Sequence, residues 1–558
     1  MSWKQRSYNA VPALRVRGEP LRRSLRYVTV AWMFGVVWMS AASGSHFKIL
    51  ASSLGFNNFA FGLLATLPFL ATFGQLVAAL MIERTGLLKY QFIHCALIHR
   101  ALWLLAAAIP LVLPIPSVLA VAVLLAVLTA SWFLGALSAP AWITWMGTLV
   151  PRRVRGRYFA HRERLAMAVQ IGVVIFLGVL MDAVYRPGDA AAVPRPVIWT
   201  ISAVLAAGAV FGMVDILLFY RVPEVLPAPP EAPAAPGGSA GESPGLLRRF
   251  VLDPLADAAF RSYVLYGATM TFSLSVAGWF FWRNALENLR FSNLATNVLF
   301  LVIGPMAGIF SARRWGRSID RWGRRPVLVI CTIGASMSLF GWFLIARDLP
   351  TPSFLGRAIA WASATVGGWV GRPEWAQAGT GAPVAAYLLA ALCCLIGGAT
   401  WSGISLAQTG IVLGFADGAG RSRYVAASSI LISTGGMLGG LVGGALAEGL
   451  AGLQANPIRW GPFLWNNWHA TFAVALLARA LTIYYLLRMP DPGAASARSL
   501  ARYMGVNVYN GLSSRLFYAL RVFGWQQPLR ASNARAVRRR SRARTPAPPG
   551  QHKRRPPR

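Results

Sequence analysis

Residues 118–146 read VLAVAVLLAVLTASWFLGALSAPAWITWM, a run without a single charged side chain. About 20 apolar residues in a helix cross the hydrocarbon core of a bilayer, and a helix satisfies its own backbone amides there. The run therefore predicts a transmembrane helix. The whole chain has this character, because 56% of its 558 residues are hydrophobic and only 13% are charged. Soluble domains carry about twice that charged fraction, which excludes a soluble globular protein.

Twelve such runs predict twelve membrane-spanning helices. Their predicted bounds are 27–50, 59–82, 92–113, 118–146, 165–185, 197–219, 262–286, 294–312, 327–346, 384–412, 425–450 and 470–487. The first run also has the basic leader and the small residues of a cleaved signal peptide. We assign it as a span because it matches the seventh run, as described next.

The two halves of the chain carry four matching patterns in the same order. In the first match an offset of 235 positions relates Lys48, Leu54, Phe56 and Asn58 to Arg283, Leu289, Phe291 and Asn293, respectively. Glu83 precedes Asp320 by 237 positions, while Arg155 and Asp182 precede Arg421 and Glu448 by 266. Such internal symmetry is typical of transporter folds. We therefore predict an all-α membrane protein of two pseudo-symmetric six-helix bundles, residues 27–219 and 262–487.

The basic residues set the predicted orientation. With both termini in the cytoplasm, 43 of the 54 Lys and Arg residues fall in cytoplasmic segments, and the reverse orientation breaks the positive-inside rule at almost every loop. We therefore predict a multi-pass protein of the plasma membrane. Its basic N-terminus, residues 1–26, lies in the cytoplasm, and its long loop 348–383 lies outside.

Two further cytoplasmic segments are predicted from composition. Residues 220–261 form a linker rich in Pro, Ala and Gly, which ends in an amphipathic helix over 246–261. The basic tail, 488–558, is expected to be largely disordered and attracted to anionic lipids. No nucleic-acid partner is expected, because the tail lacks a folded or aromatic recognition module.

The loop between the eighth and ninth spans carries a motif. Its pattern is G-x-x-x-D-R-x-G-R-R, formed by Gly316, Asp320, Arg321, Gly323, Arg324 and Arg325. Glycines permit a tight turn, and an acid at a membrane boundary suits a helix N-terminus or an arginine. Glu83, Arg84 and Gly86 repeat part of the pattern between the second and third spans. The motif resembles the signature of the major facilitator superfamily, and the resemblance covers about residues 25–490.

The resemblance implies that each motif loop contacts the start of a helix in the opposite half and stabilises the outward-facing state. Asp320 is then expected near Arg155 or Arg157, at the start of the fifth span. Glu83 is expected near Arg421 or Arg423, at the start of the eleventh. The first copy departs from the signature, with Ala79 for Gly, Glu83 for Asp, and leucines in place of the basic pair.

Four charged residues lie near the outer ends of predicted spans, where ionisable groups tend to be functional. In the superfamily the first span neighbours the fifth, and the seventh neighbours the eleventh. We therefore predict two pseudo-symmetric ion pairs, Lys48–Asp182 and Arg283–Glu448. They form either an outer gate that breaks during transport, or static ties and side chains that reach the headgroups.

The resemblance also places the first, fourth, seventh and tenth spans around a central cavity. Their polar and aromatic residues are candidate substrate contacts: Ser40, Ser43, His46, Trp132, Ser138, Trp142, Thr271, Ser275, Trp279, Trp401, Ser405, Gln408 and Thr409. Hydroxyls in membrane helices also bond to their own backbone or to a neighbouring helix. Trp142, Trp401 and Gln408 are therefore the stronger candidates.

The predicted function is a monomeric secondary or facilitative transporter that moves a small solute by alternating access. The alternative is a non-transporting membrane sensor or scaffold that uses the basic tail as its effector. No metal-binding or nucleophile motif is present, so we expect no enzymatic activity, metal or cofactor. Proton coupling stays open, because the cavity spans contain no central acid.

Overall fold

The computed structural model describes residues 10–12, 18–185, 193–226, 253–350, 352–371, 383–415, 421–489 and 496–503. Within these ranges, eleven helices are long and apolar enough to cross a membrane, and one bent helix pair makes a twelfth span. The chain is an all-α multi-pass membrane protein, as predicted. Most of the predicted linker and of the basic tail, residues 227–252 and 504–558, lies outside the described residues.

The first six spans come from eight helices. These are α1 (Gly18–Ala41), α2 (Ser45–Ser53), α3 (Asn58–Thr72), α4 (Gly74–Thr85), α5 (Leu88–Val112), α6 (Val118–Leu149), α7 (Arg152–Val184) and α8 (Arg195–Leu218), followed by the 3-10 turn η3 (Phe219–Arg221). The bent span is α1 with α2, which meet at 43°. Gly44 lies at the break with φ of 104°, a conformation that residues with a side chain rarely adopt.

The second six spans are more often interrupted. Their elements are α9 (Asp253–Ala256), α10 (Ala258–Ala277), α11 (Phe280–Arg283), the π-helix η5 (Asn284–Asn288), α12 (Asn293–Val298), the π-helix η6 (Leu299–Ile303), α13 (Gly304–Trp322), α14 (Arg324–Gly341), the 3-10 turn η7 (Trp342–Leu344), α15 (Ser353–Val370), α17 (Val384–Gly414), α18 (Arg421–Gly449), α19 (Gly452–Ala455) and α20 (Asn467–Arg488). Gly323, with φ of 94°, makes the turn between α13 and α14, inside the sequence motif.

Three spans are clearly longer than the sequence predicts. Helix α1 begins at Gly18 rather than at residue 27, α7 begins at Arg152 rather than at residue 165, and α13 continues to Trp322 rather than ending at residue 312. All three extensions are basic, so hydropathy detects only the apolar part of each helix. The predicted outer loop also contains a helix, α15, whose Trp361 and Trp369 are 73% and 84% exposed.

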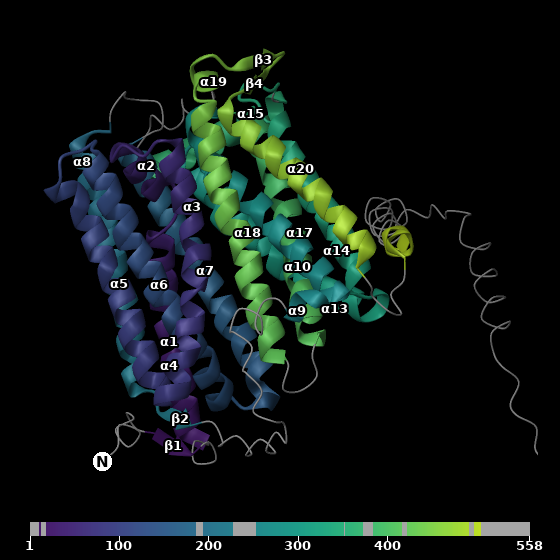
Figure 1. The fold of residues 1–558 in the computed structure, drawn as a ribbon. Helices are drawn as coiled ribbons and strands as arrows, with labels where there is room; N and C mark the ends of the chain where they lie inside the picture. Colours follow the sequence, from purple (N-terminus) through teal and green to yellow (C-terminus); the bar gives the residue numbers. More distant parts are fainter. Residues whose placement is uncertain are drawn as a thin grey trace, which may run out of the picture. The chain divides into compact units, whose positions relative to one another are not determined.

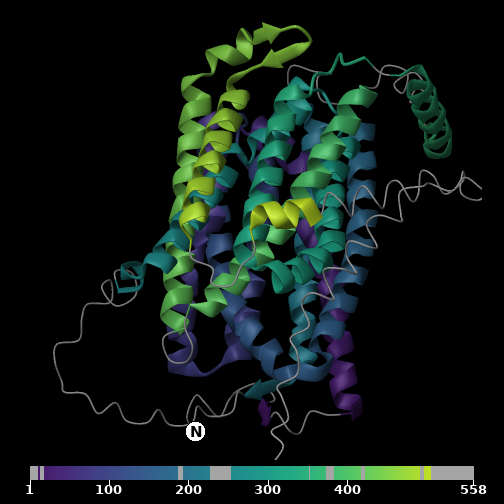
Figure 2. The same ribbon diagram turned by 90° about the vertical axis from the view of Figure 1, so that its right-hand side faces the viewer.

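Two small sheets mark the ends of the bundles. Strand β1 (Ala10–Pro12) pairs in parallel with β2 (Glu224–Leu226), and β3 (Ile458–Trp460) pairs antiparallel with β4 (Phe463–Trp465). We call the end with β1 and β2 the inner end and the end with β3 and β4 the outer end, following the predicted orientation (Figure 1). Figure 2 shows the β3–β4 hairpin at the top of the second-half helices.

The halves touch backbone to backbone at the outer end, where α3 and α18 lie side by side (Figure 1). A Cβ atom added to Gly62 of α3 would lie 2.6 Å from the Gly440 carbonyl oxygen, and one added to Gly444 would lie 2.8 Å from the Gly62 Cα. The pseudo-symmetric contact joins α7 to α12, because a Cβ on Gly178 would lie 2.6 Å from the Leu294 Cα. Small residues at these positions permit the close approach.

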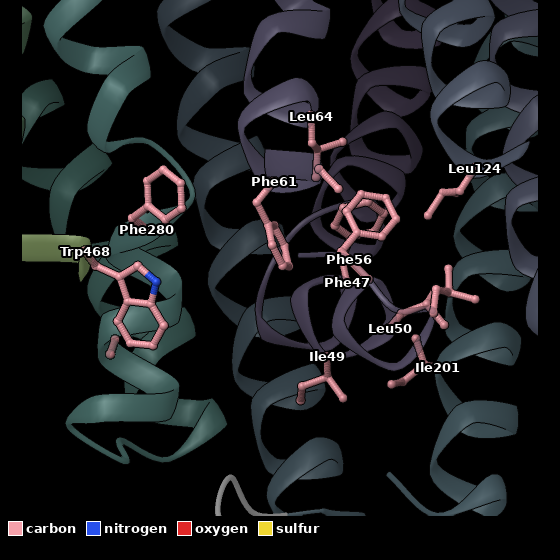
Figure 3. Packing of buried hydrophobic residues seen from close by; sticks show 14 of the residues in the cluster. Phe47, Ile49, Leu50, Phe56, Phe61, Leu64, Leu124, Ile201, Phe280 and Trp468 are labelled. Carbon is pink, nitrogen blue, oxygen red and sulfur yellow. The ribbon is translucent and has the colours of Figure 1, made fainter. Parts of the chain in front are cut away.

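A buried apolar cluster fills the outer part of the seam. Figure 3 shows Phe47 and Phe61 of the first half near Phe280 and Trp468 of the second. Each of these four side chains is at most 2% exposed. Burying a large apolar side chain contributes about 1.5–3 kcal/mol, so this packing holds the outer end closed.

The inner end is different. Cβ atoms added to Gly147, Gly156 or Gly316 would meet no described atom within 4 Å. These glycines lie on α6, α7 and α13, near the inner end of both halves. Among the described residues, the close helix contacts of the outer seam therefore have no counterpart at these positions.

Candidate functional site

A cavity of about 230 Å³ lies between the halves, next to the closed outer seam. We call it the upper chamber. Its wall includes Phe47 of α2, Trp132 of α6 and Ser275 of α10, together with Trp103 and Trp279. The structure thus brings together three of the predicted substrate contacts, Trp132, Ser275 and Trp279.

The upper chamber has aromatic walls and few polar groups. Ser275 Oγ and Trp103 Nε1 are buried and have no hydrogen-bond partner among the described residues. An unsatisfied buried polar group costs about 1–3 kcal/mol, which a bound solute or water recovers. The chamber therefore suits a small solute with an apolar or ring face and at least one hydrogen-bond acceptor.

Charged residues lie directly beside this chamber. Lys48 follows Phe47, and Arg283 follows the lining residue Trp282. Glu287 of η5 accepts hydrogen bonds from both cations: Lys48 Nζ bonds to its Oε1, and Arg283 Nη2 lies 3.1 Å from its Oε2. The side chains of Lys48, Arg283 and Glu287 are 6%, 10% and 27% exposed. The ion triad is therefore largely buried.

The triad also ties the halves together. Lys48 belongs to the first half and Glu287 to the second, so their ion pair crosses the seam. Arg283 Nη1 donates to Asn58 Oδ1 of α3, and Trp468 Nε1 donates to the same oxygen at 3.2 Å. We call these five residues, Lys48, Asn58, Arg283, Glu287 and Trp468, the outer ion cluster.

The outer ion cluster replaces the predicted pairs Lys48–Asp182 and Arg283–Glu448, which are not formed because both cations bind Glu287 instead. The duplicated pattern places Ser52 of the first half at the position equivalent to Glu287. A carboxylate is therefore present in one half only, and the two equivalent cations converge on it. The Arg283–Glu287 spacing of four residues was the available signal, because such residues lie on one helix face.

The two predicted acids have a different and symmetric role. Asp182 of α7 accepts the backbone N–H groups of Asn293 and Leu294, at 2.7 and 3.0 Å, at the start of α12. Glu448 of α18 accepts the N–H of Asn58, at 2.9 Å, at the start of α3. Helix N-termini have free N–H groups and favour negative charge. Each acid therefore caps a helix of the opposite half.

The other predicted substrate contacts do not line the upper chamber. The hydroxyls of Ser40, Ser138 and Thr409 bond to backbone carbonyls of their own helices. The hydroxyl of Ser43, in the break between α1 and α2, bonds to the Met39 carbonyl of α1. Buried His46 bonds to the Ala41 carbonyl at the end of α1, and Trp401 faces the guanidinium of Arg479 at 5.7 Å. Thr271 and Gln408 are half-buried, whereas Ser405 is exposed. Trp142 lines a second cavity, described below.

The motif residues lie at the inner end. Asp320 and Arg321 are exposed at the end of α13, and Arg325 Nη2 donates to the Leu487 carbonyl at 2.6 Å. Arg155 donates to the carbonyls of Gly147 and Val150 in its own half. The remaining members are Gly316, Gly323 and Arg324 of the second copy, Arg84 and Gly86 of the first copy, and Arg157 of α7. The side chains of Glu83, Arg421 and Arg423 lie outside what the structure describes.

No group of three or more His, Cys, Asp or Glu side chains in the described ranges could hold a metal ion.

Comparison with known proteins identifies the architecture. The family model described as Major Facilitator Superfamily matches residues 28–377. No curated protein sequence matches the chain. Among solved structures, a mutant of the nucleoside transporter NupG is similar, with a TM-score of 0.53 and 13% identity over 84% of this chain and 99% of that one. The inward-open xylose transporter XylE from E. coli has a TM-score of 0.53 and 13% identity over 87% and 99%.

Proposed function

Because the chain belongs to the Major Facilitator Superfamily and is a membrane transporter, we propose that it moves a small solute by alternating access through the upper chamber. The main observation in support of this function is the position of that chamber. It lies between the two halves and beside a charged cluster that joins them at the outer end. Rocking of the halves about such a site exposes it to each side of the membrane in turn.

In this proposal the outer ion cluster acts as a gate and opens together with the two carboxylate caps. Opening the outer end separates Lys48 from Glu287 and removes Asp182 and Glu448 from the helix starts that they cap. Contacts at the inner end must replace this lost stabilisation, since otherwise the outward-facing state would not be populated. The proposed replacements are ion pairs of the motif acids: Asp320 with Arg155 or Arg157, and Glu83 with Arg421 or Arg423.

The proposal places the protein in the plasma membrane as a monomer with both termini in the cytoplasm. That orientation brings the basic tail to the leaflet that carries anionic lipids. The proposal includes neither an enzymatic activity nor a cofactor. The similar nucleoside and xylose transporters share the fold. Their substrates are therefore only the first solutes to try in a transport assay.

Accessibility from both sides of the membrane tests alternating access without knowledge of the solute. In a variant whose four native cysteines are replaced, Ser275→Cys places one thiol in the upper chamber. A membrane-impermeant maleimide should label this thiol from the inside and, more slowly, from the outside. Labelling from one side only, under all conditions, would contradict the transporter mechanism and favour a sensor. Cysteines at exposed Arg153, at the inner end, and at exposed Asn456, at the outer end, serve as labelling controls for the two sides.

A further inference from the structure

A second cavity, of about 350 Å³, lies within the first half, among α1, α5, α6, α7 and α8. We call it the lower pocket. Its wall includes Trp32, Arg100, Trp142, Arg162 and Asp215. Helix α6 contributes Trp132 to the upper chamber and Trp142 to the lower pocket, so the two cavities follow one another along this helix. Among the described residues, the lining of the upper chamber contains no charged side chain, whereas the lower pocket has three.

The charges of the lower pocket do not cancel. Arg100 Nη2 lies 3.5 Å from Asp215 Oδ2, and both side chains are nearly buried, at 11% and 5% exposure. The other cation, Arg162, is 7% exposed, but its partner Glu163 is 50% exposed and is thus largely solvated. Solvent screens the charge of Glu163 much more than that of Arg162. A positive excess therefore remains in the pocket.

Two hydrogen-bond donors of the pocket also lack partners. Arg100 Nε and Trp32 Nε1 are buried and make no hydrogen bond with any residue that the structure describes. Arg100 itself is 9% exposed. Two buried donors and an excess positive charge together favour an acceptor that carries negative charge.

The fold makes room for these polar side chains. A Cβ added to Gly35 would lie 2.6 Å from Asp215 Oδ2, and one added to Gly212 would lie 2.8 Å from Arg100 Cδ. The guanidinium carbon of Arg162 lies 4.8 Å from the Trp32 ring and 5.2 Å from the Trp142 ring. The glycines and indole rings thus hold the charged side chains around an open volume, as in a built binding site.

We propose that the lower pocket binds a small organic anion, with its carboxylate at Arg162 and the free N–H groups of Arg100 and Trp32. Its planar apolar body lies against the indole of Trp142. A cavity of 350 Å³ is within the range of about 300–1,000 Å³ that is usual for small-molecule sites. This site goes beyond the proposed transport function, because binding in one half does not require the halves to move.

The test is equilibrium binding of benzoate to the purified full-length protein in detergent. Benzamide has the same shape without the charge, and acetate has the charge without the ring. We expect benzoate to bind and to raise the midpoint of thermal unfolding, with at least tenfold weaker binding of benzamide and acetate. Benzoate that fails to bind, or benzamide that binds as tightly, overturns the proposal.

Two variants locate the site. Arg162→Gln removes the excess charge and should weaken benzoate binding at least tenfold, whereas Arg164→Gln, an exposed arginine on the same helix, should change it less than twofold. Ala139→Leu fills the pocket from α6 without changing its charge and should also weaken binding at least tenfold, so the test survives if Arg162→Gln does not fold. Wild-type affinity in Arg162→Gln or in Ala139→Leu overturns the proposal. Solute flux is measured separately, so these outcomes are independent of transport.

Discussion

At the scale of single residues, the buried cations of this protein are stabilised in different ways. Arg283 shares a carboxylate with Lys48, and Arg100 has a carboxylate of its own. Arg479, 3% exposed, has neutral acceptors: Ser273 Oγ at 2.9 Å and the Ala335 carbonyl at 2.6 Å. Charge in the membrane is costly unless it is paired, so the loss of a carboxylate should have large effects.

Glu287→Gln removes the carboxylate that Lys48 and Arg283 share and leaves two buried cations without their anion. Removing one partner of a buried pair costs about 3–5 kcal/mol, and the partial exposure of Glu287 reduces this to about 2–3 kcal/mol. We expect a lower midpoint of thermal unfolding and faster outside labelling of Ser275→Cys. Glu19→Gln, in a pair whose side chains are both 73% exposed, is the matched control. An equal effect of the two substitutions would refute the gate role of Glu287.

Arg100→Gln should destabilise the protein by about 3 kcal/mol or more, because it removes the ion-pair partner of buried Asp215. Adding Asp215→Asn removes that charge and should restore at least half of the lost stability. The comparison uses thermal unfolding of the two single variants and the double variant, whose non-additivity measures the coupling. Strictly additive losses would show that Arg100 and Asp215 act separately.

At the scale of helices, backbone contact decides how the outer end closes. The glycines of α18 have two faces: Gly436, Gly440 and Gly444 approach α3, while Gly435, Gly439 and Gly443 approach α10. The same helix therefore packs within its own half and against the opposite half. Side chains larger than hydrogen on the first face would separate α18 from α3.

Gly62→Ala adds a methyl group against the Gly444 backbone, which cannot move aside as a side chain would. We expect a loss of about 1–3 kcal/mol for the closed outer seam, as for other overpacked contacts. Gly172→Ala, on α7, adds the same methyl where no described atom lies within 4 Å. The midpoint of thermal unfolding should fall for Gly62→Ala and stay nearly constant for Gly172→Ala. A neutral Gly62→Ala would show that the seam is looser than the structure indicates.

At the scale of the whole molecule, the halves are in contact at the outer end, whereas at the inner end built Cβ atoms on Gly156 and Gly316 meet no described atom within 4 Å. A built Cβ on Gly178 lies 3.1 Å from Leu294 Cβ, which is closer than the roughly 3.5–4.5 Å between the Cβ atoms of a disulfide. After a small outward shift of α7 from α12, the cysteine pair Gly178→Cys and Leu294→Cys should form a disulfide that holds the outer end closed.

In a background without native cysteines, oxidation of the Gly178→Cys/Leu294→Cys pair should abolish outside labelling of an added Ser275→Cys, and reduction should restore it. The inner pair Arg155→Cys/Asp320→Cys is the control and should cross-link less readily in this state. A protease site between residues 231 and 243 lets a gel distinguish linked from unlinked halves. Free outside labelling after complete cross-linking would contradict a rocking mechanism.

The twelve spans and their duplication could be predicted from the sequence alone. Apolar runs such as residues 118–146 must form helices in lipid, and the offsets between Lys48 and Arg283, or Asp182 and Glu448, are properties of the chain itself. Three lining residues of the upper chamber, Trp132, Ser275 and Trp279, were also predicted, because the resemblance assigns their spans to the cavity. The positions and order of the charged residues can likewise be read directly from the sequence.

The partners of those charges were decided only by the tertiary structure. Glu287 takes both cations, Asp182 and Glu448 cap helices of the opposite half, and Arg100 meets Asp215 inside one bundle. Each partnership depends on helix rotation and on how closely two backbones approach, and these quantities are fixed by packing between distant segments. Repeat symmetry predicted symmetric ion pairs, but Lys48 and Arg283 both bind Glu287, a carboxylate that has no equivalent in the first half.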